Sequence, residues 1–400
     1  MHVVVLGAGV IGVTTAYYLT ERGHDVTVVE RAEKVADGAS GGNGGQLSYS
    51  FTDAMASPAL LPKLPGIIAG LNPAFHVRPI PSPGLIRWGL AFLSQCRKSR
   101  HQANTAAILK LALRSGKLMN DLRANTNLEF SHRRAGKLVM LNGQSGLDEA
   151  REVCELKRQF GCDARVITPA EAIEIEPALL KMTSNYSGAV YSESDEVGDT
   201  LAFATRLAQW LGENHGTGFL MNTTVRRIVA ENSKLVAIET DRDILRPDAV
   251  VVCLGAWAAR VLDPLGIKTN IYPMRGYSIT LPATSDSNSV SITDLASKTV
   301  FSRLADSIRI AGFADFVDYR TAKDATRIRT LLETARATAP DIADFSFNPA
   351  GEWGGFRPMT PDSLPTIGPS KIKGVHLNIG HGMLGWTLAC ASGYDAAVDV

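Results

Sequence analysis

The chain has 400 residues, with 41 lysines and arginines against 40 aspartates and glutamates, and a formal net charge of +1. At about 150 residues per domain this length makes two or three domains, and a near-neutral chain without a basic block is not expected to bind nucleic acid. The five scattered cysteines form no CxxC pair. We therefore expect neither a metal site nor a disulfide framework, but reduced thiols in the cytoplasm.

Residues 3–19 form an uncharged, mostly apolar run near the N-terminus. The run lacks the basic start of a signal peptide and carries three glycines at regular spacing. No other stretch approaches the roughly 20 apolar residues that a transmembrane helix needs. We expect no membrane span, and peripheral contact with the inner face of the cell membrane stays open.

The first thirty residues have the pattern strand, glycine turn, helix, strand and acidic residue. The apolar runs His2–Leu6 and Asp25–Val29 predict parallel strands on either side of a helix over 13–22. The Gly-x-Gly-x-x-Gly between strand and helix indicates a dinucleotide fold, because it permits a tight turn, a backbone open to pyrophosphate and close helix packing. An acidic residue at the end of the second strand accepts from ribose hydroxyls. The predicted cofactor contacts are Gly7, Gly9, Val10, Ile11, Gly12, Glu30 and Arg31.

A second glycine-rich run, residues 38–46, follows the second predicted strand. Seven of its nine residues are glycine, serine or asparagine, so side chains are absent where a large group would approach the backbone. Such a run is either a flexible linker or a second loop in contact with a ligand. Asn43 and Gln46 within the run favour the ligand-contacting loop.

These motifs resemble the FAD-dependent D-amino acid oxidase superfamily, and among its members the bacterial D-amino acid dehydrogenases of the small-subunit type. In that family a Ser-x-x-Asn-x-Gly-Gln loop follows the fingerprint and lies against the flavin. Ser40, Asn43, Gly45 and Gln46 match this loop. The resemblance implies FAD as cofactor, with its adenine and ribose at the N-terminal fold.

Residues 52–135 are mostly helical by pattern and open with a proline-rich stretch. The apolar, proline-bearing patch Leu60–Ile80 either covers the site, touches a membrane or packs in the ordinary way. Further along, the strand over 249–254 ends in a small-residue turn at Gly255. The resemblance implies that this strand returns the chain to the nucleotide fold and that the backbone of Val225 faces the adenine.

Alternating strands are predicted from residue 271 to beyond 310. The resemblance implies an antiparallel sheet that roofs the flavin, with an Arg-Gly-Tyr segment as one strand. Tyr277 of this segment either points into the site as a catalytic residue or packs in the sheet.

Near the C-terminus, an arginine stands among glycine, phenylalanine and proline in the segment 354–362. An arginine fork can hold a carboxylate with two charge-assisted hydrogen bonds, and the resemblance gives Arg357 this role toward the substrate. A structural ion pair is the alternative. Relatives in the sarcosine-oxidase branch carry a flavin-linking cysteine at this point, so Arg357 leads us to expect FAD bound without a covalent link.

A Gly-His-Gly segment at 380–382 precedes the last predicted helix. Close backbone approach and a positive helix end suit the flavin pyrimidine. The resemblance implies that the Gly382 carbonyl accepts from the substrate amine, and it favours a flavin-positioning role over a catalytic base for His381. The predicted contacts of this segment are Gly382, Met383, Gly385, Trp386 and Thr387.

The fold expected is therefore α/β, with a discontinuous, Rossmann-like FAD domain (1–51, 160–262 and 350–400) and an α+β substrate domain on an antiparallel sheet (52–159 and 263–349). The reaction expected is oxidation of a D-amino acid to a 2-oxo acid and ammonia by hydride transfer from Cα to flavin N5, with electrons passed to a quinone or another acceptor. The alternatives are an oxidase that uses O2 on glycine, sarcosine or a D-proline-like substrate, and a flavin-holding subunit of a larger complex. The oligomeric state is left open.

Overall fold

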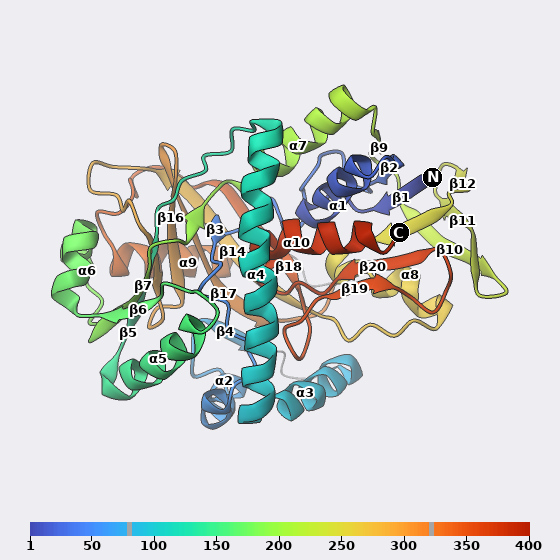
Figure 1. Cartoon of the computed structure of the whole chain (residues 1–400). Coiled ribbons are helices and arrows are strands. Elements are labelled where there is room, and N and C mark those ends of the chain that lie inside the picture. The colour runs from blue at the N-terminus through green and yellow to red at the C-terminus, as the bar shows by residue number, and fades with distance from the viewer. Residues whose placement is uncertain (78–81, 320–323) are drawn as a thin grey trace.

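The computed structural model describes residues 1–77, 82–319 and 324–400. The chain forms two lobes, each built on a large β-sheet, and the long helix α4 (Lys98–Thr126) runs across their junction (Figure 1). Both termini lie in the lobe that holds β1 (Figure 1).

The first lobe is built on a six-stranded sheet in the order β19-β20-β13-β1-β2-β9. Its strands are β1 (His2–Leu6), β2 (Asp25–Val29), β9 (Gly218–Leu220), β13 (Ala249–Val252), β19 (Thr366–Pro369) and β20 (Val375–Ile379). All neighbours pair in parallel except β19 and β20. The valine-rich central strands are buried on both faces, as parallel strands require.

Different elements cover the two faces of this sheet. Helices α1 (Val10–Glu21), α7 (Thr200–His215) and α10 (Gly385–Val398) pack on one face, and α4 packs against α10. The other face carries a three-stranded sheet and α8 (Ala259–Leu262). That small sheet consists of β10 (Val225–Glu231), β11 (Lys234–Thr240) and β12 (Ile244–Leu245).

The second lobe is a nine-stranded, mostly antiparallel sheet in the order β18-β14-β17-β16-β15-β5-β7-β6, with β4 paired to β17. Its strands are β4 (Phe75–Val77), β5 (Lys137–Leu141), β6 (Arg165–Ile167), β7 (Gly188–Ser192), β14 (Tyr272–Pro282), β15 (Ser291–Asp294), β16 (Thr299–Leu304), β17 (Ser307–Phe316) and β18 (Ala350–Met359). Helix α9 (Ala325–Thr338) packs on one face, where Ile279, Ile310 and Leu331 are fully buried. The other face of β14, β17 and β18 is turned toward the first lobe.

Short elements connect the lobes or cover their edges. Strand β3 (Gln46–Leu47) pairs with β8 (Glu196–Val197) between the two large sheets. The remaining elements are η1 (Pro58–Lys63), α2 (Leu64–Ile68), α3 (Pro83–Gln95), α5 (Gly143–Arg158), α6 (Pro169–Ile175), η2 (Pro177–Lys181), η3 (Gly255–Trp257) and η4 (Asp263–Leu265). The last residues of the predicted patch Leu60–Ile80 lie outside the described residues, whereas its start forms η1 and α2.

The expected fold class is confirmed: a discontinuous parallel-sheet lobe stands beside a lobe with a mostly antiparallel sheet. The strand pairing does not follow all the predicted domain boundaries. Strands β6 and β7 fall within 160–262, yet they pair with each other and β7 pairs with β5 in the second lobe. Likewise β18 falls within 350–400, yet it pairs with β14. Sequence order does not reveal which sheet a short strand joins, because its pairing partner decides that.

Within the described residues, no helix is long and apolar enough to cross a membrane. In the same part of the chain, no cluster of histidine, cysteine and acidic side chains could hold a metal ion. All five cysteines are free and buried.

Candidate active site

A cavity of about 1500 Å³ runs between the two lobes, from the glycine turn after β1 to the inner face of β18. Pockets for small ligands usually have ~300–1,000 Å³. This cavity is therefore large enough for an extended cofactor together with a substrate. Its walls come from both sheets and from helices α2, α3 and α10.

The glycine turn forms the first end of the cavity. Gly7 has a φ of 102°, and a Cβ atom on Gly12 would stand 1.8 Å from the Gly7 carbonyl oxygen, so a larger residue cannot replace Gly12. Gly7, Gly9, Val10 and Ile11 line the cavity, whereas Gly12 contributes only the close packing. The N-cap residue of helix α1, Gly9, has no side chain to cap the helix, and Ser40 Oγ accepts only from the Val10 N–H, which leaves the next backbone N–H groups for a phosphate.

Glu30 and Arg31 follow β2 and line the same end of the cavity. The Glu30 carboxylate accepts from the backbone N–H groups of Ala8 (2.8 Å) and Ala32 (2.9 Å). Two backbone donors hold the carboxylate in place, and its remaining lone pairs can accept from ribose hydroxyls.

Arg31 and a second arginine lie over the ring of Trp257, a tryptophan that the sequence patterns did not single out. The Arg31 and Arg260 guanidinium carbons each lie 4.3 Å from the ring centroid of Trp257. Burial lowers the pKa of Arg31, and the charge of Arg260 adds to this effect, against the influence of Glu30. Two cations at the cavity wall beside an uncapped helix start complement a diphosphate. Gly255, two residues before Trp257, also lines the cavity, and so does Val225 on the adjoining small sheet.

The glycine-rich run 38–46 is a fixed loop and not a linker. The Gly42 carbonyl accepts from Ser278 Oγ (2.8 Å), and the Asn43 carbonyl accepts from Arg309 Nη1 (2.8 Å). A Cβ atom on Gly42 would overlap the ring of Trp353, at 2.1 Å. These bonds tie the loop to the inner face of the second sheet, where Asn43 and Gln46 line the cavity.

Two residues of the family motif in this loop, Ser40 and Gly45, mainly make contacts within the protein. Ser40 Oγ accepts from the Val10 N–H at 2.9 Å, so it joins the loop to the start of α1. Gly45 has a φ of 75° and packs beside Leu304 without lining the cavity.

A buried lysine reaches this loop from β5. Lys137 Nζ donates to Gln46 Oε1 (3.1 Å) and to Ser48 Oγ (2.7 Å) and lines the cavity. Burial lowers the pKa of Lys137 to about 8, although Asp195 acts in the opposite direction. Burial also raises the pKa of Asp195 to about 6. No sequence motif indicates this cluster around Lys137, because strands that lie far apart in the sequence bring its residues together.

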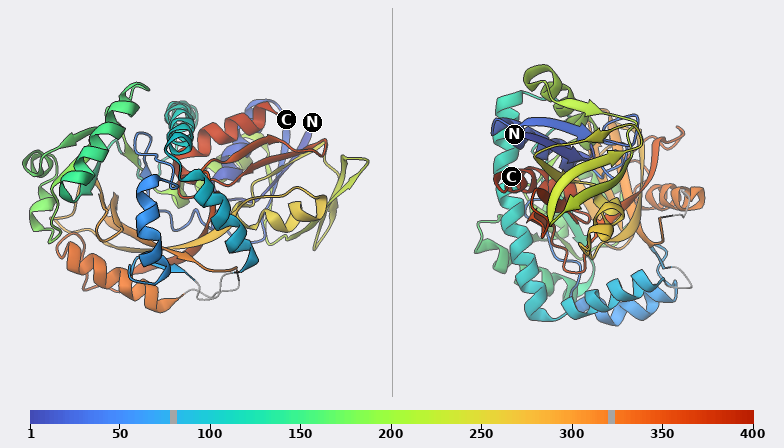
Figure 2. Two further views of the ribbon diagram at one scale, coloured as in Figure 1. Left: turned by 90° about the horizontal axis from the view of Figure 1, so that it is seen from below. Right: turned by 90° about the vertical axis from the view of Figure 1, so that its right-hand side faces the viewer.

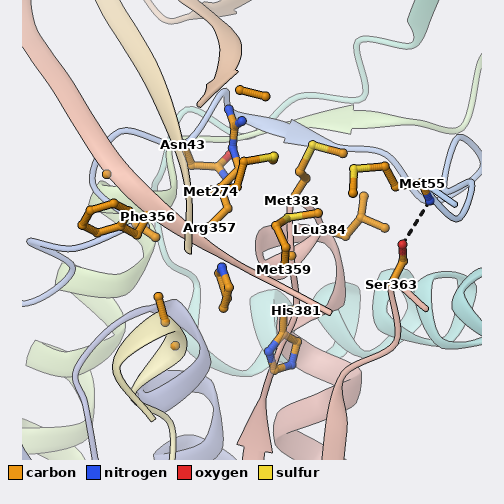
Figure 3. Close-up of a pocket in the computed structure, with 18 of the residues that line it drawn as sticks. Asn43, Met55, Met274, Phe356, Arg357, Met359, Ser363, His381, Met383 and Leu384 are labelled. Atoms are coloured by element: carbon orange, nitrogen blue, oxygen red, sulfur yellow. Dashed lines mark hydrogen bonds between the residues drawn. The ribbon is translucent and has the colours of Figure 1, made fainter. Parts of the chain in front are cut away.

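Arg357 lies on β18 opposite Met274 of β14 and lines the cavity from the second lobe (Figure 3). Its Nη1 donates to the Phe313 carbonyl at 2.9 Å. Burial lowers the pKa of Arg357 to about 10, so the group stays cationic at neutral pH. Among the described residues no carboxylate forms an ion pair with it, unlike Arg327, which pairs with Asp315. The structural ion pair considered from the sequence is therefore not found.

The surroundings of Arg357 are built to hold it. Gly276 leaves the room, since a Cβ atom there would stand 2.3 Å from the guanidinium carbon. Phe313, which supplies the carbonyl, has a φ of 61°, a conformation that bulky residues rarely adopt. Four methionines, Met55, Met274, Met359 and Met383, line the cavity around this point (Figure 3).

The Gly-His-Gly segment comes between β20 and α10 and forms the wall near the methionines. His381 is buried, its Nε2 has no hydrogen-bond partner among the described residues, and burial lowers its pKa to about 3. A neutral imidazole faces the cavity, which fits a positioning role and not that of a base at neutral pH. Gly382, with a φ of 54°, donates its N–H to the Pro358 carbonyl at 3.0 Å.

Helix α10 starts at Gly385 without a side-chain cap, and Met383, Gly385, Trp386 and Thr387 all line the cavity. Thr387 Oγ1 accepts from the Ser48 N–H at 3.1 Å. The indole of Trp386 packs on Phe130 and Phe203 in the core and donates to the Gly198 carbonyl, so it anchors the start of α10.

Tyr277, the third predicted catalytic residue, does not line the cavity. Its side chain is 2% exposed, packs in the core under α9 and donates its hydroxyl to Asp315 Oδ2 at 2.7 Å. Successive residues of a strand point to opposite faces. Met274 lines the cavity and is an odd number of positions from Tyr277, so the Tyr277 side chain points to the face away from the cavity. The packing alternative for Tyr277 is therefore correct, and the catalytic one is wrong.

The cavity fits the FAD that the sequence motifs predict. It offers the starts of α1 and α10, whose N-cap residues make no side-chain cap bond, and a buried histidine nitrogen that lacks a partner among the described residues. Such groups suit a large ligand with a phosphate end and a polar ring.

Comparisons with known proteins agree with this geometry. The family model described as FAD dependent oxidoreductase, DAO, matches residues 2–397. "D-amino acid dehydrogenase 2" of Ralstonia nicotianae is 36% identical over 401 residues, covering 98% of this chain and 94% of the relative. "D-amino acid dehydrogenase" of Paramagnetospirillum magneticum is 36% identical over 396 residues, covering 98% and 93%.

Solved structures show the same fold at low identity. The L-proline dehydrogenase from P. horikoshii has a TM-score of 0.76 at 21% identity, covering 99% of this chain and 92% of the other. The glycine oxidase from Geobacillus kaustophilus has a TM-score of 0.75 at 22% identity, covering 99% and 93%.

Proposed function

We propose that this chain, which belongs to the DAO family of FAD-dependent oxidoreductases, oxidises D-amino acids to 2-oxo acids and ammonia and passes the electrons to a quinone or another acceptor. The single observation that carries the proposal is Arg357, a cation that faces the cavity without a described carboxylate partner. The D configuration is supported by the names of relatives that are 36% identical over nearly the whole chain.

The residues that would hold FAD follow from the two ends of the cavity. Glu30 would accept from the ribose, the start of α1 and Arg31 would meet the diphosphate, and the start of α10 would face the flavin pyrimidine. Bound FAD supplies the acceptor for the hydride that leaves the substrate Cα. We propose that it is held without a covalent link.

Arg357 would bind the substrate carboxylate through its fork of N–H donors. The Phe313 carbonyl accepts from one guanidinium nitrogen and so holds the group in place, so little orientational freedom is lost when the carboxylate binds. The methionine side chains would surround the substrate Cα and keep water away from it.

The amine end of the substrate would meet the Gly382 carbonyl. His381 is neutral at all but acid pH, because burial lowers its pKa to about 3, and Tyr277 is bonded to Asp315 outside the cavity. Neither His381 nor Tyr277 therefore offers a proton acceptor to the cavity at neutral pH. We propose that the substrate reacts as its neutral amine, so that the rate rises as the substrate ammonium loses its proton.

The test is an anaerobic visible spectrum of the purified, FAD-loaded protein, to which D-alanine or D-proline, then the L-isomers, and finally air are added. Bleaching of the yellow band near ~450 nm by a D-isomer alone is expected. The variant Arg357→Met should keep FAD and lose bleaching, whereas the control Arg151→Met, exposed on α5, should bleach as the natural chain does.

Each other outcome has a defined meaning. Bleaching by glycine or sarcosine alone would replace the D-amino acid by those substrates, and rapid return of colour in air would make the enzyme an oxidase. A yellow protein that no amino acid bleaches would overturn the proposal and leave a flavin-holding subunit.

A further inference from the structure

Two buried lysines lie over the ring of Phe51, but only one of them faces the cavity. Lys137 on β5 is 5% exposed and Lys157 on α5 is 2% exposed, with Nζ atoms 4.8 Å and 5.0 Å from the ring centroid. Lys157 Nζ forms an ion pair with Asp53 at 2.9 Å and does not line the cavity. Lys137 lines the cavity and forms no ion pair with a carboxylate among the described residues. The charge of Lys137 is therefore available to whatever the cavity binds.

The hydrogen-bond partners of Lys137 do not neutralise its charge. Nζ donates to two uncharged oxygens, Gln46 Oε1 at 3.1 Å and Ser48 Oγ at 2.7 Å. Asp195 is the acidic group that acts on it most strongly, but Asp195 Oδ1 accepts from the Ser50 N–H at 2.8 Å, and Asp195 does not line the cavity. A buried cation without a paired carboxylate is costly to hold, and such groups gather at functional sites. This placement indicates a ligand that uses the charge.

Hydrogen bonds connect Lys137 to the start of α10. Ser48, whose hydroxyl accepts from Lys137, donates its N–H to Thr387 Oγ1 at 3.1 Å. Thr387 stands in the first turn of α10, which begins beside α4 and runs from there toward the C-terminus (Figure 1 and the left view of Figure 2). Lys137, Ser48 and Thr387 all line the cavity. Two hydrogen bonds thus join the cation to the helix start that would face the flavin pyrimidine.

The proposed reaction adds negative charge at this end of the cavity. A hydride carries two electrons and one proton from the substrate Cα to flavin N5, so the ring is reduced and gains one negative charge, while the substrate is oxidised to the iminium ion. A fixed cation at the place where negative charge develops stabilises it without any rearrangement. The start of a helix carries only about half a positive charge, so a full charge on Lys137 adds to the contribution of α10.

We propose that Lys137 raises the reduction potential of the bound FAD, because its charge favours the reduced, anionic ring over the oxidised one. This inference rests on the proposed function for the place of the flavin, and it holds whichever amino acid is oxidised. A unit charge about 8 Å from another, at an effective dielectric constant of about 20, changes an equilibrium about thirty-fold. Lys157 should have no such effect, since Asp53 cancels its charge.

The midpoint potential of the FAD-loaded protein, measured anaerobically against reference dyes and without substrate, tests the proposal. Lys137→Gln removes the charge but still offers N–H donors to Ser48, whereas Lys137→Met removes both. Both variants should lower the equilibrium constant for two-electron reduction about thirty-fold, which is ~45 mV at about 30 mV per ten-fold. A natural potential in Lys137→Gln and a lower one in Lys137→Met would make the residue a structural donor and overturn the proposal.

The pH dependence supplies a second readout, which the natural chain shows by itself. Burial lowers the pKa of Lys137 to about 8, with Asp195 and Asp53 acting against this and Lys157 adding to it. Burial raises the pKa of Asp195 to about 6, so this carboxylate is ionised above neutral pH. Lys137 is therefore charged at pH 7 and loses its proton above about pH 8, while reduction of the flavin strengthens its hold on that proton.

The potential of the natural chain should accordingly fall more steeply with pH between about 8 and 9.5 than it does below pH 7. The difference from Lys137→Met should be full at pH 7 and nearly gone at about pH 10. A slope without this change in the natural chain would contradict the proposal even if no variant at Lys137 folded.

The matched control removes the ion pair on the other side of Phe51. Lys157→Met with Asp53→Asn takes away a buried cation together with its carboxylate, so the midpoint potential should stay at the natural value. An equal fall in this control, or natural potentials in both Lys137 variants, would overturn the proposal. Natural potentials with a raised KM for D-glutamate would instead place Lys137 at the substrate side chain. Failure of every amino acid to bleach the flavin would contradict the proposed function and leave the potentials to stand, because they are measured without substrate.

Discussion

Replacing Arg357 with methionine should change stability and activity in opposite directions. Methionine fills a similar volume, which keeps the cavity wall intact, and removes the cation. Burial lowers the pKa of Arg357 from 12.5 to about 10, and at about 1.4 kcal/mol per pKa unit this is a cost of ~3 kcal/mol to hold the cation there. The guanidinium still borders the cavity, so solvent reduces this figure.

The bond from Arg357 Nη1 to the Phe313 carbonyl acts against this cost. A hydrogen bond from a charged donor contributes about 1.5–3 kcal/mol. The net expectation is a free energy of unfolding that rises by about 1 kcal/mol or stays level in the FAD-free Arg357→Met protein. The folded pKa lies below the unfolded one, so the cost is present in full below pH ~10 and fades as pH rises above it.

Activity should fall steeply in the same variant. Loss of one partner from a desolvated charge pair costs about 2–5 kcal/mol, which is a fall of about a thousand-fold in kcat/KM for the D-amino acid. Urea denaturation at pH 8 gives the stability, and anaerobic stopped-flow bleaching gives the rate. An unfolding free energy lower by more than ~2 kcal/mol, or a rate within ten-fold of the natural chain, would refute the role of Arg357 as a cavity-facing anchor.

Three further predictions follow from groups near the cavity. Because burial lowers the pKa of His381 to about 3, the unfolded chain binds a proton below pH ~6.5 that the folded chain does not, so the free energy of unfolding should fall by up to about 1.4 kcal/mol per pH unit below that point. The variant His381→Asn should flatten this slope in pH-dependent denaturation, and an unchanged slope would contradict a neutral His381. The lowered pKa of Lys137, about 8, should make stability rise between pH 8 and about 10.5, and Lys137→Met should abolish the rise while the purified protein still binds FAD. Gly12→Ala should lose FAD and at least ~3 kcal/mol of stability, because its Cβ would stand 1.8 Å from the Gly7 carbonyl oxygen. The control Gly146→Ala on α5, with open space around it, should gain ~0.5–1 kcal/mol of stability, and equal melting temperatures for the two variants would contradict the packing at Gly12.

Local signals in the sequence were enough for the parts of the site that depend on the backbone. Gly7, Gly9 and Gly12 owe their places to conformation and close packing, which a short pattern records. Glu30 was found because its distance from the glycines is fixed by one helix and one strand. Arg357 could be placed because a charged residue among glycine, phenylalanine and proline is rare without a function.

Other parts depend on contacts between distant strands. Tyr277 points away from the cavity because its parity along β14 is opposite to that of Met274, and parity is known only once a neighbouring residue has been placed. The contact of Arg31 with Trp257 and the bond from Lys137 to Gln46 join segments that lie far apart in the sequence. The side of each strand and the partner of each charge are set by tertiary packing, which no local pattern contains.

The order β19-β20-β13-β1-β2-β9 has a consequence for how the protein reaches its folded state. Strand β1 pairs with β13, nearly 250 residues later, and α1 packs against α10 at the far end of the chain. Contacts of such long sequence separation slow folding, since loop closure precedes any gain from the contact. The cofactor site is therefore completed only after α10 has been synthesised, and we expect FAD capture to follow the packing of α10 on α1. Refolding from urea should accordingly show a slow phase in which flavin fluorescence changes together with the docking of α10.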